Sequence, residues 1–73
     1  MGIVAGTIEI NRERLKQLRR ERALSQRALS HLSSVSLDAV NQLETGKRKA
    51  RPITVRKLAE ALGVEPKELM KVE

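Results

Sequence analysis

The sequence contains no cysteine and no aromatic residue. The lack of cysteine excludes a disulfide framework, a thiolate metal site and a thiol nucleophile. The lack of phenylalanine, tyrosine and tryptophan means that leucine, valine, isoleucine and alanine must form the core. In a chain of 73 residues, folding removes only about 60% of the surface of the unfolded chain, so this core is thin. We therefore expect one small domain, held by packing alone and without a large enzyme cleft.

Histidine and long apolar runs are also scarce. His31 is the single histidine, and without cysteine the chain offers too few ligands for a zinc site. The hydroxyls near His31 fit capping and turn positions, so we do not expect it to act in catalysis. No apolar run approaches the roughly 18 residues that cross a bilayer, and the N-terminal residues do not resemble a signal peptide. We therefore expect a cytoplasmic protein that is not an enzyme, with no metal, no cofactor, no small-molecule ligand and no membrane partner.

Positive charge is in excess and unevenly distributed. The chain has 15 lysine and arginine residues against nine acidic residues, a net charge of +6. Residues 1–57 hold thirteen of the bases and five of the acids, whereas residues 58–73 hold two bases and four acids. A surface that is basic at one end fits a polyanion. By charge alone, nucleic acid is the first candidate, and an anionic membrane surface or an acidic protein are the others. The membrane is the weaker of these, because no helix concentrates bases opposite large aromatic residues.

The apolar residues from residue 11 onwards recur with helical spacing and predict five short helices. Asparagine or serine is in position to cap the first three, and proline at the first helical position opens the fifth. Glycine ends the third and the fourth. The predicted starts are, in order, Asn11, Ser25, Ser36, Thr54 and Glu65, and the two terminating glycines are Gly46 and Gly63.

The first ten residues do not join a helical pattern. They are rich in β-branched residues and could form a short strand, but a single strand has no partner in this chain. We expect residues 1–9 to form an N-terminal arm, either flexible or a short strand, and residues 10–73 to form the domain.

The second and third predicted helices are separated by only three or four residues. So short a connection favours a steep crossing over an antiparallel hairpin. Leu29, Val35, Val40 and Leu43 recur where two crossed helices must meet, and the small Ser30 lets their backbones approach. The pattern therefore predicts two short helices that cross at a steep angle.

Three motifs follow one another along the chain. They are LRRERALSQ at residues 18–26, VS at residues 35–36 followed by QLETGKR at residues 42–48, and LAEALGV at residues 58–64. In this order they resemble the repressor/Cro-type helix-turn-helix family, DNA-binding domains of phage repressors and many bacterial regulators. The resemblance covers residues 10–70. It implies an all-α, five-helix fold of the lambda-repressor type, with the helix-turn-helix formed by the second and third helices.

The resemblance implies that the opening residues of the third helix face base edges in the major groove. The Gln42 amide can pair with adenine, Leu37 can contact a thymine methyl group, and Asp38 can accept a hydrogen bond from cytosine. Asp38 can equally serve the helix alone, because the macrodipole favours an acid in the first turn. The implied base contacts are Leu37, Asp38, Asn41 and Gln42.

The resemblance also implies phosphate contacts before and after the third helix. Gln26 and Arg27 begin the second helix, where backbone N–H groups favour an anion. The second group is a basic loop, which we define by its four cations, Lys47, Arg48, Lys49 and Arg51. No acidic residue lies between Glu44 and Glu60, so this part of the chain is well suited to hold a phosphate backbone.

Arg19 and Glu44 resemble a pair that links the first and third helices in some members of the family, and we expect a structural ion pair. Two positions depart from the family, which often has glycine where this chain has Ala23 and Ser34. A left-handed backbone there would cost a residue other than glycine about 1 to 2 kcal/mol. We therefore expect the chain to avoid that conformation at both positions.

The sequence thus predicts a sequence-specific transcriptional regulator, a repressor, that binds double-stranded DNA and forms a homodimer at least on DNA. The alternative is a protein-interaction module on the same fold, such as an antitoxin subunit or an adaptor, because a fold does not define a function. The third helix distinguishes them. DNA binding requires Asn41, Gln42 and the basic loop to face outward together, whereas a partner-binding surface would expose Leu37 and other apolar side chains.

Overall fold

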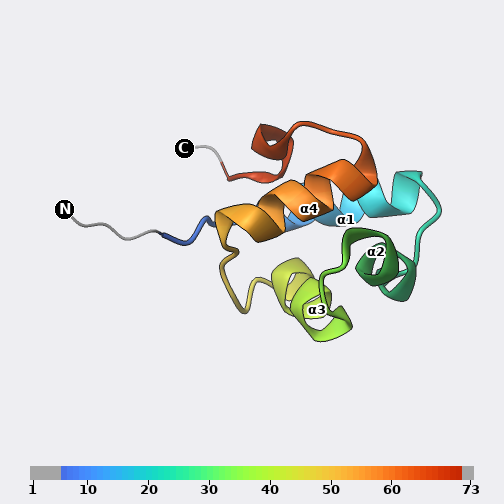
Figure 1. Cartoon of the computed structure of the whole chain (residues 1–73), viewed down its shortest axis with the longest axis horizontal. Coiled ribbons are helices and arrows are strands. Elements are labelled where there is room, and N and C mark those ends of the chain that lie inside the picture. Colours follow the sequence, from blue (N-terminus) through green and yellow to red (C-terminus); the bar gives the residue numbers. More distant parts are fainter. Residues whose placement is uncertain (1–5, 72–73) are drawn as a thin grey trace.

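The computed structural model describes residues 6–71, which fold into four α-helices followed by one 3₁₀ turn (Figure 1). The elements are α1 (Arg12–Glu21), α2 (Gln26–Ser33), α3 (Leu37–Thr45), α4 (Pro52–Leu62) and η1 (Pro66–Leu69). α4 packs against α2 and η1, α1 packs against α3 and η1, and α2 packs against α3. α3 and η1 lie on opposite sides of the domain, and the loop from α3 to α4 follows one edge of it (Figure 1).

Side-chain caps start the first three helices, as the sequence predicts. The capping residues are Asn11, Ser25 and Ser36. Each side-chain oxygen accepts from the backbone N–H three residues later, at 3.1, 2.9 and 3.1 Å. Each bond satisfies an N–H that has no partner inside its helix. Gly46 and Gly63 end α3 and α4 in the left-handed conformation, so these two predicted ends are also confirmed.

Two other helix predictions are wrong. α4 begins at Pro52 and not at Thr54, with Arg51 as its N-cap residue. Proline suits the first helical position because its φ is already helical and its missing N–H would have no partner there. The predicted fifth helix is a single 3₁₀ turn of four residues. It ends there because Met70 adopts an extended conformation and pairs with Ile10.

Aliphatic side chains fill the core, as expected for a sequence without aromatic residues. The largest fully buried side chains are Leu15, Leu29, Leu43, Leu58, Leu62, Leu69, Val40 and Val55. Two polar residues, Ser33 and Glu44, are buried among them. A buried carboxylate is costly unless it is paired and hydrogen-bonded, so Glu44 must have partners inside the protein.

The N-terminal segment, defined as residues 8–12, contacts the domain. Ile8 and Ile10 each form a single antiparallel β-bridge, with Ala50 and with Met70 respectively. Pairing partners therefore exist, although the sequence shows no second strand. Residues 1–5 of the predicted arm lie outside the described residues, so the boundary between arm and domain stays a prediction.

Ala23 and Ser34 have left-handed backbones, with φ of 56° and 60°, so the expectation that the chain avoids this conformation is wrong. At the end of α1, the Ala23 N–H donates to the carbonyl of Arg20 (2.9 Å), and the Leu24 N–H donates to the carbonyl of Arg19 (3.1 Å). Together these bonds form a Schellman motif, in which the residue at the position of Ala23 is left-handed. The two hydrogen bonds to carbonyls of α1 offset the free-energy cost of the left-handed conformation at Ala23.

Ala23→Gly is expected to raise the free energy of unfolding by about 0.5 to 1 kcal/mol. Glycine removes the steric cost of the left-handed conformation. It also raises the entropy of the unfolded chain, which lowers stability, but by a smaller amount. The thermal midpoint should rise by roughly 2 to 8 °C. The control is Ala61→Gly inside α4, where the same substitution should lower the midpoint. A lower midpoint for Ala23→Gly would contradict the prediction.

Candidate nucleic-acid interface

α3 has an apolar face in the core and a polar face toward solvent. The core face holds Ala39, Val40 and Leu43. The four residues predicted to contact bases lie on the other face, with exposed positions at Leu37, Asp38 and Asn41 and a half-buried one at Gln42. The structure therefore brings all four together on the outer surface of one short helix.

Three of these side chains form hydrogen bonds within the protein. Gln42 Nε2 donates to Asp38 Oδ2, one turn earlier in α3, at 3.2 Å. Asn41 Nδ2 donates to Gln26 Oε1 on α2, at 3.4 Å. Both bonds are exposed, where water competes with them, so their net contribution to stability is modest. Exchanging either bond for a bond to a base edge is therefore inexpensive.

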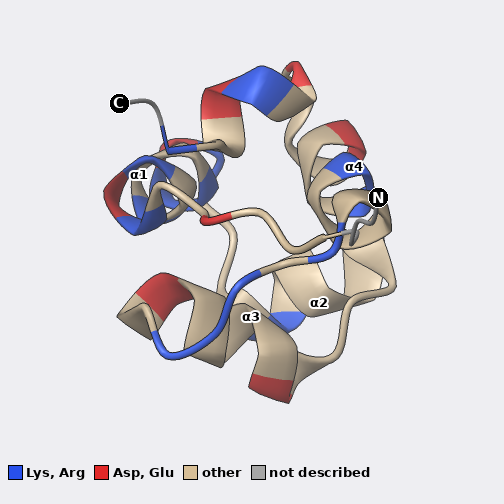
Figure 2. Cartoon of the chain, turned by 90° about the vertical axis from the view of Figure 1, so that its left-hand side faces the viewer, with Lys and Arg blue, Asp and Glu red and all other residues tan. Residues whose placement is uncertain are grey.

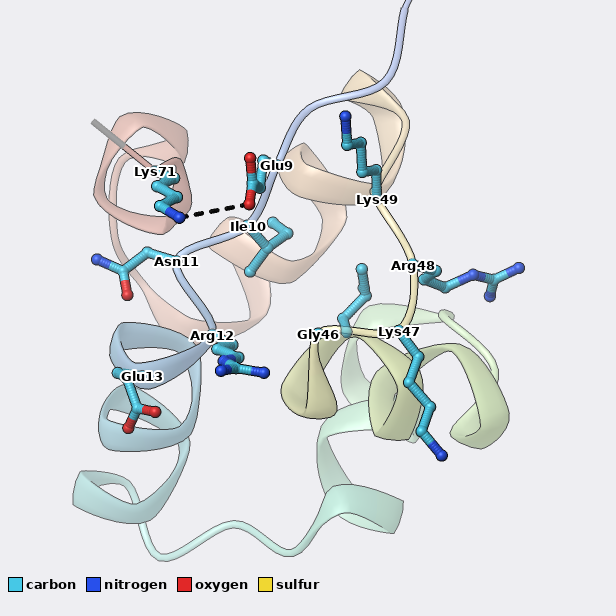
Figure 3. Close-up of a pocket in the computed structure, with 11 residues that line it drawn as sticks. Glu9, Ile10, Asn11, Arg12, Glu13, Gly46, Lys47, Arg48, Lys49 and Lys71 are labelled. Atoms are coloured by element: carbon cyan, nitrogen blue, oxygen red, sulfur yellow. Dashed lines mark hydrogen bonds and ion pairs between the residues drawn. The ribbon is translucent and has the colours of Figure 1, made fainter. Parts of the chain in front are cut away.

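The basic loop begins directly after α3. Figure 2 shows it as a nearly continuous positive segment between α3 and α4. Its four cations are exposed, and within residues 6–71 none of them is paired with a carboxylate. In Figure 3 the side chains of Lys47, Arg48 and Lys49 extend from the loop in different directions. Arg27 on α2 is likewise exposed. These charges remain available to an external polyanion.

A buried ion pair links α3 to α1, and the pair expected between Arg19 and Glu44 is present. Arg19 Nε and Nη2 donate to Glu44 Oε2 and Oε1 at 2.6 and 2.9 Å, and the two side chains are 12% and 2% exposed. Arg19 Nη1 donates to the carbonyl of Leu24 at 2.8 Å. The guanidinium thus joins α1, the loop after it and α3 through three charge-assisted hydrogen bonds.

Gln26 adds α2 to this network. Its Nε2 donates to Glu44 Oε1 at 3.0 Å, while its Oε1 accepts from Asn41. The side-chain amide predicted to bind phosphate is therefore used inside the protein. An amide carries two N–H groups, so a second donor remains for a phosphate oxygen. The phosphate contact of Gln26 stays a prediction, and its link to α3 is what the structure adds.

The network keeps both charged groups ionised. Burial would raise the pKa of the Glu44 carboxyl, but hydrogen bonds from Arg19 and Gln26 and the charges of Arg19 and Lys16 outweigh burial and lower the pKa. The hydrogen bond to Glu44 raises the pKa of Arg19, against the effect of burial and with the help of the opposite charge. Both shifts favour the charged forms, so the pair is ionised at neutral pH.

Acid is expected to remove the stabilisation that Glu44 provides. Its pKa is lower in the folded chain than in the unfolded chain, so the contribution is complete above the unfolded pKa. It is lost as the pH falls below the ordinary glutamate pKa of about 4.3 and on through the lower folded pKa. Glu44→Gln should therefore unfold more easily than wild type at pH 7, and the difference should shrink at pH 3 in urea titrations. A constant difference between the two proteins would contradict this prediction.

Arg12 belongs to the site, although its local sequence does not mark it. Its Nη1 donates to the carbonyl of Thr45 at the end of α3, at 2.9 Å. Its side chain also covers Gly46 so closely that a Cβ there would lie 2.5 Å from Nη1. Arg12 and Thr45 are 33 residues apart, and nothing in the sequence pairs them. Together with the residues around it, Arg12 borders a hollow of about 700 Å³ between residues 9–13 and 46–49 (Figure 3).

Among residues 6–71, no three histidine or acidic side chains are grouped so that they could hold a metal ion. No helix of the described region has the length and apolar character needed to cross a membrane. His31 is exposed on α2.

Comparisons with known proteins identify the same arrangement of helices in one protein family. The profile of a family described as helix-turn-helix matches residues 15–69. The HTH-type transcriptional repressor RghR of Bacillus subtilis (strain 168) is 42% identical over 59 residues, which are 80% of this chain and 44% of RghR. The chain therefore spans less than half the length of this relative.

Two solved structures show the same fold. The restriction-modification controller protein C.AhdI from Aeromonas hydrophila is 39% identical, with a TM-score of 0.77 over 81% of this chain and 89% of that one. A hydroxyethylphosphonate dioxygenase variant is 26% identical, with a TM-score of 0.78 over 89% of this chain but only 14% of the enzyme. The family profile covers most of the sequence, and the two solved structures each cover more than four fifths of it. The chain belongs to the helix-turn-helix family.

Proposed function

We propose that this protein is a sequence-specific transcriptional regulator, a repressor, that binds double-stranded DNA with α3 in the major groove. One observation carries the proposal: the polar outer face of α3 leads directly into a basic loop whose cations have no acidic partner in residues 6–71. An α-helix fits the major groove, and adjacent cations can hold the phosphates at its edge. The relatives described as a repressor and as a controller protein support regulation.

Base readout is assigned to the outer face of α3. Gln42 would pair with adenine, and Asp38 would accept from cytosine once Gln42 releases it. Leu37, 36% exposed, would contact a thymine methyl group. Asn41 would bind a base or a phosphate after leaving Gln26. Asp38 and Gln42, which are hydrogen-bonded to each other within α3, are thus both proposed to contact bases.

Phosphate binding is assigned to the basic loop, with Gln26 and Arg27 at the start of α2. These contacts would set the register of α3 on the duplex without reading sequence. The partner is double-stranded DNA, and we propose that the protein acts in the cytoplasm, on the DNA held there.

Lys49→Ala is expected to weaken binding by a similar factor on every duplex. The plot of log affinity against log salt should become shallower by about 0.9, because one fewer phosphate is neutralised. The control is Lys67→Ala, which removes an exposed cation from η1 on the far side of the domain. The assignment fails if Lys49→Ala weakens only one selected sequence, or if both variants change the slope equally. Fluorescence anisotropy over a range of salt concentrations measures these slopes.

We also propose that two copies bind together on DNA. One α3 contacts only a few base pairs, so a long specific site needs a second copy. In dimeric helix-turn-helix proteins the two recognition helices are about 34 Å apart, one turn of the duplex. The expected site is an inverted repeat whose half-sites have that spacing.

A protein-binding module is the second candidate, favoured by exposed apolar side chains beside the turn between α2 and α3. Leu32 is 61% exposed and Leu37 is 36% exposed. The dioxygenase also shows that the fold can occur within a protein described by another activity. Against this candidate, the rest of the outer face of α3 is polar and continuous with the basic loop.

Selection from random duplexes tests the proposal. The expected result is enrichment of one sequence family that contains an inverted repeat. Enrichment of a single half-site would support DNA binding and contradict the dimer. Retention of all sequences equally, or of none, would overturn sequence-specific regulation and favour the protein-binding module.

A further inference from the structure

The basic loop is bonded to the N-terminal segment at its far end, and the last residue of α3, just before its near end, is bonded to the same segment. At its far end, the Ile8 N–H donates to the carbonyl of Ala50 at 2.6 Å, and the Ala50 N–H donates back to the carbonyl of Ile8 at 2.9 Å. At its near end, Arg12 donates to the carbonyl of Thr45. Ala50 is only 3% exposed, so this pair of backbone bonds is shielded from water. Arg48 and Lys49 lie between the two attachments, with exposed side chains.

The N-terminal segment is itself held from its other side. The Asn11 N–H donates to the carbonyl of Leu69 at 2.8 Å, and the Lys71 N–H donates to the carbonyl of Glu9 at 2.9 Å. The side chains of Glu9 and Lys71 form an ion pair at 3.4 Å, drawn as a dashed line in Figure 3. The segment therefore lies between the basic loop and the residues that follow α4, bonded to both.

We propose that residues 8–12 are a positioning element that holds the basic loop in its phosphate-binding conformation before DNA arrives. This inference rests on the proposed DNA-binding function. A free loop would lose conformational entropy on binding the phosphate backbone, and that loss would weaken association. Two backbone bonds at one end and one guanidinium contact at the other remove much of this loss in advance. No residue of the element needs to touch DNA for this effect.

Ile8→Pro tests the proposal, because proline has no N–H to donate to Ala50. Ile8→Ala is the matched control, since it shortens the same half-buried side chain and keeps the N–H. Both proteins are titrated with random-sequence duplex over a range of salt concentrations, well below their thermal midpoints. Ile8→Pro should bind about three- to tenfold more weakly and with a shallower salt slope, although its charge is unchanged. Ile8→Ala should retain the wild-type slope.

These titrations distinguish a failure of the proposed DNA-binding function from a failure of the positioning role. If wild type binds no duplex, the proposed function fails. If wild type binds and folded Ile8→Pro matches it in affinity and slope, the positioning role is overturned while the function stands. Equal losses in Ile8→Pro and Ile8→Ala also overturn it, because the side chain and not the backbone bond would then be responsible.

Amide hydrogen exchange in the wild-type protein without DNA gives a second test that needs no variant. The Ala50 N–H should be protected well above the N–H groups of Arg48 and Lys49, which donate no backbone hydrogen bond within residues 6–71. Exchange of Ala50 as fast as its neighbours would show that the loop opens freely and would overturn the proposal. This result decides the matter even if Ile8→Pro does not fold.

Discussion

Arg19→Ala is expected to lower the free energy of unfolding by about 3 to 5 kcal/mol, because it leaves the buried Glu44 carboxylate without its charge partner. A domain of this size has a total stability on the order of 5 to 10 kcal/mol, so the loss is a large part of it. The carbonyl of Leu24 loses its guanidinium donor in the same variant. Urea unfolding, read by circular dichroism, measures the loss.

Arg14→Ala is the matched control for this prediction. Arg14 lies on the same helix and also pairs with a glutamate, Glu68, at 2.9 Å, but both side chains are 36% exposed. An exposed pair contributes roughly 0 to 1 kcal/mol, so the control should unfold almost like wild type. Equal stability of the two variants would show that the Arg19 pair does not hold the fold. Arg19 would then be assigned to the phosphate-binding cations.

Gln42→Ala is expected to cost about 1 to 3 kcal/mol of binding free energy on the selected DNA site and almost nothing on random DNA. The reason is that a bidentate amide contact to adenine exists only where that base is present. The substitution also leaves the Asp38 carboxylate without its donor, close to the proposed DNA surface. Parallel titrations with the selected duplex and a scrambled duplex measure the difference.

Gln17→Ala controls for the loss of a glutamine from a helix surface. Gln17 Nε2 donates to Glu21 Oε2 at 3.1 Å, an exposed bond within α1 much like the one between Gln42 and Asp38. Removing it should leave both DNA affinities unchanged. Gln42 ceases to be a base reader if its substitution weakens the selected and scrambled duplexes by the same factor.

Helix starts could be predicted because each depends on a few neighbouring atoms. A serine or asparagine oxygen reaches the N–H three residues later whatever the rest of the chain does, so three caps were identifiable. The start of α4 was harder, since Arg51 forms no side-chain cap and proline alone marks the first turn. The short η1 was harder still, because Met70, directly after it, forms a β-bridge with the distant Ile10.

The candidate site likewise has features that the sequence predicts and contacts that it does not. The polar outer face of α3 follows from helical periodicity, and the basic loop follows from composition. Contacts of Gln26 with Glu44, and of Arg12 with Thr45, join residues 18 and 33 positions apart. No local sequence pattern distinguishes either pair from other pairs of the same residue types.

By itself, the sequence determined which segments become α1 to α4, which face of α3 stays polar and where positive charge is concentrated. Those properties arise from periodicity, capping and composition, which act within one or two turns. Only the tertiary structure decided that Ala23 and Ser34 take left-handed backbones and that the N-terminal segment contacts both the end of α3 and the basic loop. These features depend on how helices cross and which chain ends meet, and the packing of the whole core sets that geometry.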